Sequence, residues 1–326
     1  MTPLRLAHTP TPVRRLEALC RDGFDLWLKD DGASHPLYGG NKVRKLEYIL
    51  ADALGRGAKR LVTSGAAGSH QVLATALFGR QNGLPVLAVV CPQRRTPHAE
   101  AMLRATVGSG AQLVPVGSQP MVGVQTARVL RRGDYLVPPG ASNVVGTLGY
   151  VAAVRELVAQ IRRGEVPDPD VIVVPLGSGG TAAGLLAGVA REGLRARVVA
   201  VEVATHPRLG RAMVLALAYA ALRRDGGAAS LSALSRRLEV DGDHLGPGYG
   251  EPTSAGARAM EDASGLGVVL DPTYTAKTFA RVLEEAGRRH ASGKWIYWHT
   301  LSTAPLGPLL GDSAASLPAK IGSLLV

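Results

Sequence analysis

Two hydrophobic patterns alternate along this chain. Short, almost continuous apolar runs, such as 86–90 and 171–175, predict strands that are buried on both faces. Between these runs lie longer segments, such as 147–163, in which apolar residues recur at helical spacing. Strands that alternate with helices in this way predict an α/β fold with doubly wound, largely parallel sheets.

The same patterns predict the other elements. Further strands are expected at 24–29, 60–63, 112–116, 135–137, 198–203 and 295–300. Further helices are expected at 43–55, from about 70 to 82, from about 97, at 122–130, after 181 and at 213–222. The stretch 223–250 shows the least regular pattern, so we predict an irregular surface segment there.

Composition and charge limit the classes of partner. The net charge of +11 suggests nucleic acid, but the arginines are scattered and aromatic residues are only 4%, too few for a base-stacking surface. Two uncharged runs, 135–154 and 171–190, are long enough to span a bilayer, yet prolines or glycines interrupt both. We therefore predict neither a nucleic-acid nor a membrane partner.

The cysteines indicate a reducing compartment. Cys20 and Cys91 are the only two in 326 residues, too few for a disulfide framework or a metal site. Residues 1–6 lack the continuous apolar core of a signal peptide. These features predict a cytoplasmic protein without a bound metal.

Lys42 is the first candidate for chemistry. It follows Gly39-Gly40 at the start of a predicted amphipathic helix. A lysine taken alone is usually a solvated surface residue. However, only seven of the 37 basic residues are lysines, and Lys45 lies three positions away. A lysine with a lowered pKa can form an imine, which an arginine cannot do.

A glycine-rich turn between a strand and a helix is the second candidate. It consists of Gly177, Ser178, Gly179, Gly180 and Thr181. Backbone N–H groups, hydroxyls and a helix N-terminus at such a turn can hold a phosphate, although a tight turn without a ligand is the alternative. It matches neither a Walker loop nor a dinucleotide fingerprint. An amine and a phosphate cradle together are the two anchors that pyridoxal phosphate needs.

The stretch 38–48 resembles the Gly-Gly-Asn-Lys-x-Arg-Lys-Leu-Glu segment of the aminocyclopropane-carboxylate deaminase and D-cysteine desulfhydrase family. These are pyridoxal-phosphate enzymes related to the tryptophan synthase β subunit, of fold type II. The resemblance spans about 25–305 in five separate motifs. It implies a homodimer of two-lobed subunits, with a large cofactor-binding domain from 1–46 and 152–326 and a small inserted domain at 47–151.

The resemblance also implies roles around the cofactor. Lys42 would be the Schiff-base lysine, with Asn41 beside it as a further cofactor contact. Residues 177–181 match the family's phosphate loop, and Lys45 would add a charge to the phosphate. Thr300, at the end of the last predicted strand, would hydrogen-bond the pyridine nitrogen. The glycines that follow in the family are Leu301-Ser302 here.

Ser69 and His70 belong to a motif that departs from the family pattern. A serine at a helix N-terminus is either a cap or a carboxylate ligand. Ser69 matches the family's substrate-binding serine, whereas His70 stands where the family has an asparagine on the cofactor's ring oxygen. The resemblance implies that both residues contact substrate or cofactor, and the histidine makes a different substrate an open alternative.

Two tyrosines complete the predicted site. Tyr249 and Tyr274 lie in segments whose tyrosines face the substrate in the family, although buried tyrosines often only support a core. Aminocyclopropane-carboxylate deaminases carry a glutamate after the second tyrosine, where D-cysteine desulfhydrases have a small hydroxyl residue. Thr275 occupies that position here and favours the latter activity.

We therefore expect a pyridoxal-phosphate-dependent lyase or deaminase acting on a small amino acid. The first expectation is α,β-elimination from D-cysteine, with Lys42, Ser69, Tyr249 and Tyr274 as catalytic residues. Ring-opening deamination of 1-aminocyclopropane-1-carboxylate is the alternative within the family. A basic nucleic-acid-binding protein and a cofactor-binding protein without catalysis are the alternatives from other classes.

Overall fold

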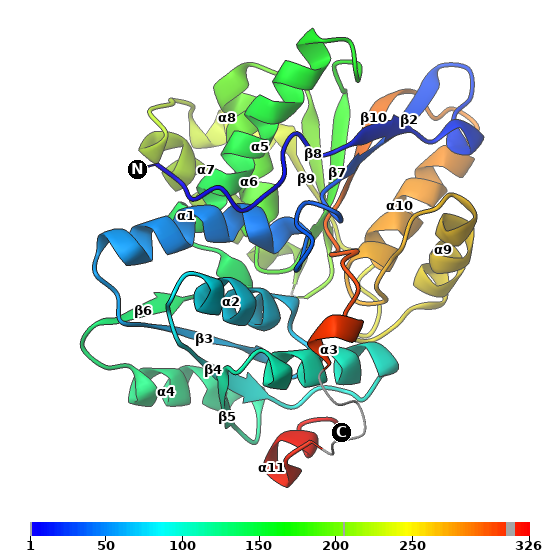
Figure 1. Ribbon diagram of the computed structural model, residues 1–326. Helices are drawn as coiled ribbons and strands as arrows, with labels where there is room; N and C mark the ends of the chain where they lie inside the picture. Colours follow the sequence, from blue (N-terminus) through cyan, green and yellow to red (C-terminus); the bar gives the residue numbers. More distant parts are fainter. Residues whose placement is uncertain (1, 205, 311–316) are drawn as a thin grey trace. The chain divides into compact units, whose positions relative to one another are not determined.

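A computed structural model describes residues 2–204, 206–310 and 317–326 (Figure 1). Strands and helices alternate through most of this part of the chain, as the sequence predicts. The chain forms two compact units. Unit 1 consists of Met1–Arg5, Leu46–Ala141 and Ala304–Val326, and unit 2 of Leu6–Lys45 and Ser142–Thr303. The predicted domains, a large one from 1–46 and 152–326 and a small inserted one at 47–151, stay a prediction.

Unit 2 contains a six-stranded sheet in the order β1-β2-β10-β7-β8-β9. Its strands are β1 (Val13–Arg15), β2 (Phe24–Asp30), β7 (Val171–Leu176), β8 (Arg197–Glu202), β9 (Leu238–Asp241) and β10 (Gly293–His299). Only the short edge strand β1 pairs antiparallel with its neighbour among the described pairs. The predicted α/β fold with largely parallel sheets is confirmed.

Helices cover both faces of this sheet, as its apolar strands require. They are α5 (Val144–Arg162), α6 (Gly180–Glu192), α7 (Pro207–Arg224), α8 (Leu231–Arg237), α9 (Ser254–Gly265) and α10 (Thr275–Gly287), with a short 3-10 turn at Glu17–Leu19. Figure 1 shows α5, α6 and α7 on one side of the sheet and α9 and α10 on the other. Phe279 of α10 packs with Val173 and Val199 in the core between α9, α10 and the sheet.

Unit 1 contains a parallel four-stranded sheet in the order β5-β4-β3-β6. Its strands are β3 (Arg60–Ala66), β4 (Val86–Cys91), β5 (Gln112–Pro115) and β6 (Asp134–Val137). Its helices are α2 (His70–Gln81), α3 (Pro97–Gly108), α4 (Gln119–Val129) and α11 (Ala319–Gly322), with 3-10 turns at Pro139–Ala141 and Gly307–Leu309. Helix α1 (Asn41–Gly55) starts in unit 2 and continues in unit 1.

The prediction of an irregular segment at 223–250 is wrong for its middle part. Residues 231–241 form α8 and then β9, which pairs in parallel with β8 at the edge of the sheet. Strand β9 has four residues and is half-buried, so it offers too few positions for an alternating pattern to be recognised in the sequence. Its pairing depends on the neighbouring strand.

Helix α5 is the one helix in the described ranges that is long and apolar enough to cross a membrane. In the structure 67% of its apolar window is buried, and it packs against α6. Burial of this kind is also found in the core helix of a globular unit.

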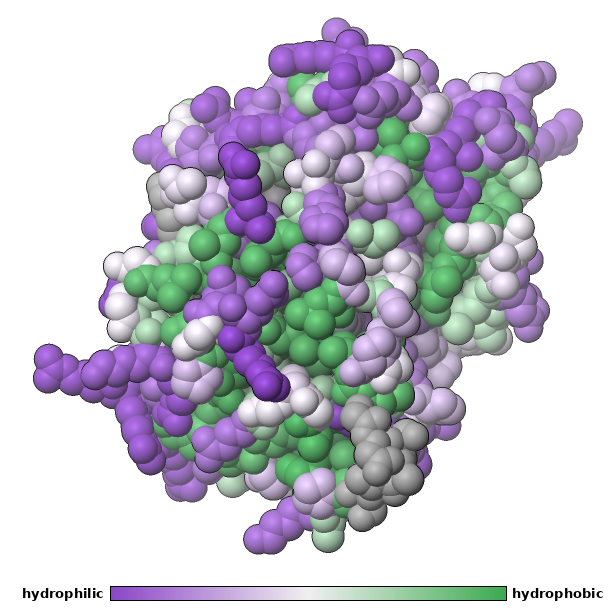
Figure 2. Space-filling view, viewed as in Figure 1, coloured by the Kyte–Doolittle hydropathy of each residue, from purple (hydrophilic) through white to green (hydrophobic). Residues whose placement is uncertain are grey.

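Part of the positive charge is neutralised at the surface. Arg155 pairs with Glu192 at 3.0 Å, and Arg197 pairs with Glu239 at 2.6 Å. Figure 2 shows hydrophilic residues spread over much of the face it draws, with apolar residues between them. The arginines therefore belong at least partly to a solvated, ion-paired surface.

Candidate active site

The double glycine before α1, Gly39-Gly40, allows the backbone at Asp31 and at Thr300 to pack closely against the start of this helix. Gly40 has φ of +78°, and a Cβ there would come within 2.6 Å of the carbonyl oxygen of Thr300. Its N–H donates to the carbonyl of Asp31 at 2.7 Å, and the next N–H, that of Asn41, donates to the carbonyl of Thr300 at 3.0 Å. A side chain at Gly40 would break this arrangement. The start of α1 is thereby fixed against the end of β10.

Lys42 lies in the first turn of α1, as predicted, and is partly shielded from solvent. Its ammonium donates to Oδ1 of Asn41 at 2.7 Å, and Nδ2 of Asn41 donates to Oγ1 of Thr181 at 3.0 Å. Burial lowers the pKa of Lys42 to about 8, against the opposing effect of Asp271. A substantial fraction of this amine is therefore neutral near pH 8 and able to react with a carbonyl.

A cradle for an anion lies at the N-terminus of α6. The hydroxyls of Ser142 and Ser178 are 2.7 Å apart, and the N–H of Gly180 and the ammonium of Lys45 donate to Oγ of Ser142 at 3.1 and 3.3 Å. Gly179 caps α6 with φ of +81°. A Cβ on Gly180 would lie 2.5 Å from Oγ of Ser142 and 3.0 Å from Nζ of Lys45. The glycine keeps this polar space open.

The electrostatics of the cradle favour an anion. Lys45 is only 1% exposed, and both burial and the nearby Lys42 lower its pKa well below the usual value. A phosphate close to the two lysines would offset their mutual repulsion. We refer to Lys45, Ser142, Ser178 and Gly180 as the anion cradle.

Ser142 is a member of the cradle that the sequence analysis missed. It comes two residues after Gly140 and directly before Asn143, which caps α5 by accepting a hydrogen bond from the N–H of Gly146 at 2.8 Å. Like residues 177–181, the stretch 140–144 has a glycine and then a serine just before the start of a helix. This shared feature is a signal that could have identified Ser142.

The two predicted tyrosines meet beside the glycine-rich turn. Their hydroxyls are 2.7 Å apart, and Cε1 of Tyr274 lies 3.2 Å from the position of a Cβ on Gly177. Burial, and then the neighbouring phenol of Tyr249, raises the pKa of Tyr274 well above its usual value. Tyr274 therefore remains protonated and can donate a hydrogen bond or a proton.

Thr275 points into the protein, toward Asp271. Its hydroxyl donates to Oδ2 of Asp271 at 2.7 Å and accepts from the N–H of Asp271 at 2.7 Å. Oδ1 of Asp271 accepts the N–H groups of Thr273 and Tyr274 at 2.9 and 2.7 Å. Thr275 thus acts on the start of α10, which directly follows Tyr274.

The strand end at Thr300 lies against the start of α1 through the backbone bond to Asn41. Ser302, one of the two residues that replace the family's glycines, accepts the N–H of Gly39 on Oγ at 2.8 Å. His299 has partners at both ring nitrogens, Oδ1 of Asp30 at 2.9 Å and the carbonyl of Val269 at 2.8 Å. These contacts give His299 and Ser302 supporting positions.

Ser69 and His70 lie in unit 1, at the start of α2. Oγ of Ser69 accepts the N–H of Val72 at 3.4 Å, which is the capping contact considered from the sequence. Nε2 of His70 lies 2.9 Å from Nε2 of His98 in α3. The predicted contacts of Ser69 with the substrate and of His70 with the cofactor stay predictions.

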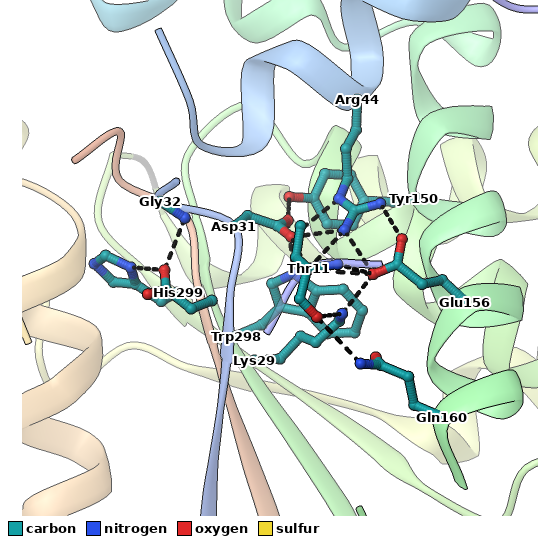
Figure 3. Close-up of polar contacts among 11 residues, drawn as sticks. Thr11, Lys29, Asp31, Gly32, Arg44, Tyr150, Glu156, Gln160, Trp298 and His299 are labelled. Carbon is teal, nitrogen blue, oxygen red and sulfur yellow. Dashed lines mark hydrogen bonds and ion pairs between the residues drawn. The ribbon is translucent and has the colours of Figure 1, made fainter. Parts of the chain in front are cut away.

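A buried ionic network surrounds Arg44, two residues after Lys42 (Figure 3). Arg44 pairs with Asp31 at 2.8 Å and with Glu156 at 2.9 Å, and Glu156 also pairs with Lys29. Further contacts come from Thr11, Tyr150, Gln160 and Trp298. The network ties α1 to β2, α5 and β10, and no sequence pattern indicated it.

The comparison with protein families shows which family the chain belongs to. A family described as pyridoxal-phosphate dependent enzyme matches residues 4–300. The chain belongs to this family. It is a pyridoxal-phosphate-dependent enzyme, which confirms the cofactor and the family resemblance inferred from the sequence.

Relatives of this enzyme have similar length. The D-cysteine desulfhydrase of Salmonella paratyphi A is 30% identical, with 91% of this chain and 93% of the relative aligned. A Thermotoga maritima protein with the provisional name 1-aminocyclopropane-1-carboxylate deaminase is 32% identical, with 90% and 94% aligned. The solved structure of a homologue of that deaminase matches with a TM-score of 0.83 at 28% identity, covering 100% of this chain and 97% of that chain.

A second solved structure supports the fold alone. The L-serine ammonia-lyase of Rhizomucor miehei matches with a TM-score of 0.67 at 19% identity, over 93% of this chain and 97% of that chain. Together with the parallel sheets of both units, these matches confirm a fold type II enzyme.

The residues of unit 2 fit pyridoxal phosphate. An amine with a pKa of about 8 suits the aldehyde, and the space kept open at Gly180 lies beside the hydroxyl of Ser142 and the ammonium of Lys45, which suits a phosphate. Lys42 would hold the aldehyde carbon, while the anion cradle and Thr181 would hold the phosphate. These individual assignments stay predictions.

Proposed function

We propose that this enzyme is a lyase that removes a β-substituent from a small amino acid, with D-cysteine as its first substrate. The products are pyruvate, ammonia and hydrogen sulfide, formed from D-cysteine and one water. The observation that carries the proposal is the reactive amine of Lys42 next to the anion cradle in unit 2. The D-cysteine desulfhydrase relative supports the choice of substrate.

Lys42 moves the proton in this reaction. When bound, the cofactor supplies an aldehyde for the substrate's amino group and a ring that delocalises the negative charge left at Cα. In the loaded enzyme the neutral amine of Lys42 would take the α-proton, and its pKa of about 8 suits a general base working near neutral pH. Asn41 accepts a hydrogen bond from Lys42 and keeps its nitrogen in place.

Tyr274 and Tyr249 handle the departing group. The phenol of Tyr274 remains protonated and shares a hydrogen bond with Tyr249. A phenol of this kind can donate its proton to a thiolate that leaves Cβ, which avoids the release of a bare anion. Ser69 and the N-terminus of α2 are assigned to the substrate carboxylate on the basis of the family motif.

Ring-opening deamination of 1-aminocyclopropane-1-carboxylate is the second candidate. The Thermotoga maritima relative and the solved homologue favour it. Thr275 argues against it. The resemblance places a glutamate after the second tyrosine in these deaminases, whereas the residue here is a threonine whose hydroxyl binds Asp271. A substrate panel that includes this compound separates the two candidates.

The enzyme's surroundings are part of the same proposal. We assign it to the cytoplasm because Cys20 and Cys91 are both free. We propose a homodimer on the basis of the family resemblance, and no nucleic-acid or membrane partner. Light scattering of the cofactor-loaded enzyme measures its mass against the 33.9 kDa of one chain.

The test combines spectroscopy with a substrate panel. The purified enzyme and a Lys42→Ala variant are loaded with pyridoxal phosphate, and their visible spectra are recorded before and after borohydride. We expect a band that borohydride abolishes and that the variant lacks. Pyruvate and sulfide release are then measured with D- and L-cysteine, D- and L-serine, β-chloroalanine and 1-aminocyclopropane-1-carboxylate.

Release of sulfide and pyruvate from D-cysteine, lost in Lys42→Ala, supports the proposal. Formation of 2-oxobutanoate from the cyclopropane compound would instead support the second candidate. Normal loading without turnover of any panel member contradicts the proposed reaction and leaves a cofactor-binding protein.

A further inference from the structure

A buried lysine in unit 2 lies outside the anion cradle. Lys277 of α10 is 0% exposed, and its ammonium donates to the carbonyl of Leu245 at 2.7 Å and to that of Gly248 at 3.0 Å. Burial lowers the pKa of Lys277, while nearby Glu251 and Asp271 act in the opposite direction. Burying an ammonium is costly unless such partners compensate it, so these two bonds are important to the segment they hold.

The segment held by Lys277 is 242–253, which carries Tyr249. It contains three glycines with positive φ, namely Gly246 at +65°, Gly248 at +151° and Gly250 at +78°. Its internal backbone bonds are long, 3.3 Å from the N–H of Leu245 and 3.4 Å from that of Glu251. Glycine-rich backbone has many conformations open to it, so an external anchor has a large effect on its order.

The start of α10 therefore fixes both phenols. Tyr274 precedes the helix and is held by Asp271, and Lys277, three residues later, holds the backbone on both sides of Gly246 and next to Tyr249. The result is the 2.7 Å contact between the hydroxyls of Tyr249 and Tyr274. Tyr249 itself is 37% exposed, so packing fixes its position less than it fixes that of a fully buried residue.

We propose that Lys277 is a positioning residue for the reaction, which sets Tyr249 against Tyr274 by anchoring the segment 242–253. The inference rests on the proposed function of the two tyrosines. Lys277 acts through the backbone carbonyls of Leu245 and Gly248, and it touches neither substrate nor cofactor in this role.

A double-mutant cycle tests the proposal. Lys277→Met, Tyr249→Phe and the double variant are compared in the cofactor-loaded enzyme, by kcat/KM with the best substrate of the panel. We expect Lys277→Met to lower kcat/KM about tenfold, and to lower it less than about twofold in the Tyr249→Phe background. A lysine with a general structural role would lower kcat/KM by the same factor in both backgrounds.

Hydrogen exchange gives a readout that needs no turnover. Amides of 242–253 should exchange faster in Lys277→Met than in the wild-type enzyme, while the visible spectrum of the bound cofactor is unchanged. Lys294→Met is the matched control, because Lys294 is an exposed lysine on β10 of the same unit. It should leave exchange and kcat/KM unchanged.

A second variant covers the case in which Lys277→Met does not fold. Lys277→Gln retains a donor for one of the two carbonyls, so we expect a smaller effect in the same direction. Unchanged exchange in 242–253, or equal losses of kcat/KM in both Tyr249 backgrounds, would overturn the proposal. If no panel member is turned over, the proposed reaction fails, and the exchange measurement still decides whether Lys277 anchors the segment.

Discussion

Lys42 shows how its surroundings change an ordinary side chain. In water a lysine is almost entirely protonated at neutral pH, whereas burial at the start of α1 lowers the pKa of Lys42 to about 8. Asp271 limits the shift, because its charge favours the protonated form. Burial therefore makes the amine of Lys42 reactive without the help of a basic residue next to it in the sequence.

The rate at which the cofactor-free enzyme binds pyridoxal phosphate covalently should depend on pH through this group. Only the neutral amine attacks the aldehyde, so the rate should rise from pH 6.5, reach half its maximum near pH 8 and level off above pH 9. Stopped-flow absorption in the visible range measures it. A rate that still rises through pH 10, as for a free lysine, would contradict the lowered pKa.

Helix α10 shows how the start of one element organises several functional groups. The carboxylate of Asp271 accepts the N–H groups of Thr273 and Tyr274. The hydroxyl of Thr275 completes the turn, because it accepts the N–H of Asp271 and donates to the carboxylate of Asp271. Such a turn holds Tyr274 beside Gly177 more firmly than the helix alone would. Thr275 therefore acts on Tyr274 through local structure.

Thr275→Val tests the importance of this turn. The variant keeps the shape of the side chain but leaves the N–H and a carboxylate oxygen of buried Asp271 without their hydroxyl partner. We expect the free energy of unfolding to fall by about 1–3 kcal/mol, measured by urea denaturation. Thr275→Ser retains the hydroxyl and serves as the control. Equal stability of the valine and serine variants would show that the two hydrogen bonds contribute little.

At the scale of the whole molecule, the network around Arg44 joins elements that are far apart in the sequence. Arg44 and Lys29 face Asp31 and Glu156 in a region shielded from water (Figure 3). Their positive neighbours lower the pKa values of both carboxyl groups against the effect of burial. Because these pKa values are lowered on folding, the resulting stability is present above the ordinary carboxyl pKa and is lost as the pH falls.

Arg44→Met should destabilise the enzyme strongly. It leaves the buried carboxylates of Asp31 and Glu156 without their main partner, which costs about 3–5 kcal/mol in comparable buried pairs. Arg288→Met is the control, because Arg288 pairs with Glu284 and Glu285 at the surface, where such pairs contribute about 0–1 kcal/mol. Urea denaturation at pH 7 compares them, and similar losses in the two variants would contradict the importance of the buried network.

Much of the fold was predictable because hydrophobic spacing is a property of neighbouring residues. The positions of β2, α1, β4 and β7 follow from patterns within each segment, and the N-terminal position of Lys42 follows from Gly39-Gly40 and the apolar spacing after it. The turn at 177–181 was likewise visible as glycines between a strand and a helix. By itself the sequence determined the α/β class and the order of strands and helices from β2 as far as α7, and it placed Lys42 and the turn at 177–181 at the helix starts where the structure has them.

Tertiary structure alone decided which residues meet. Ser142 joins Ser178 in the anion cradle although 36 residues separate them, and Lys277 reaches Leu245 over 32 residues. Neither pairing follows from spacing within one element, because it depends on how helices and loops pack on the sheet. Local preferences act over a few residues, whereas the site and its supports arise from contacts that exist only after the chain has folded.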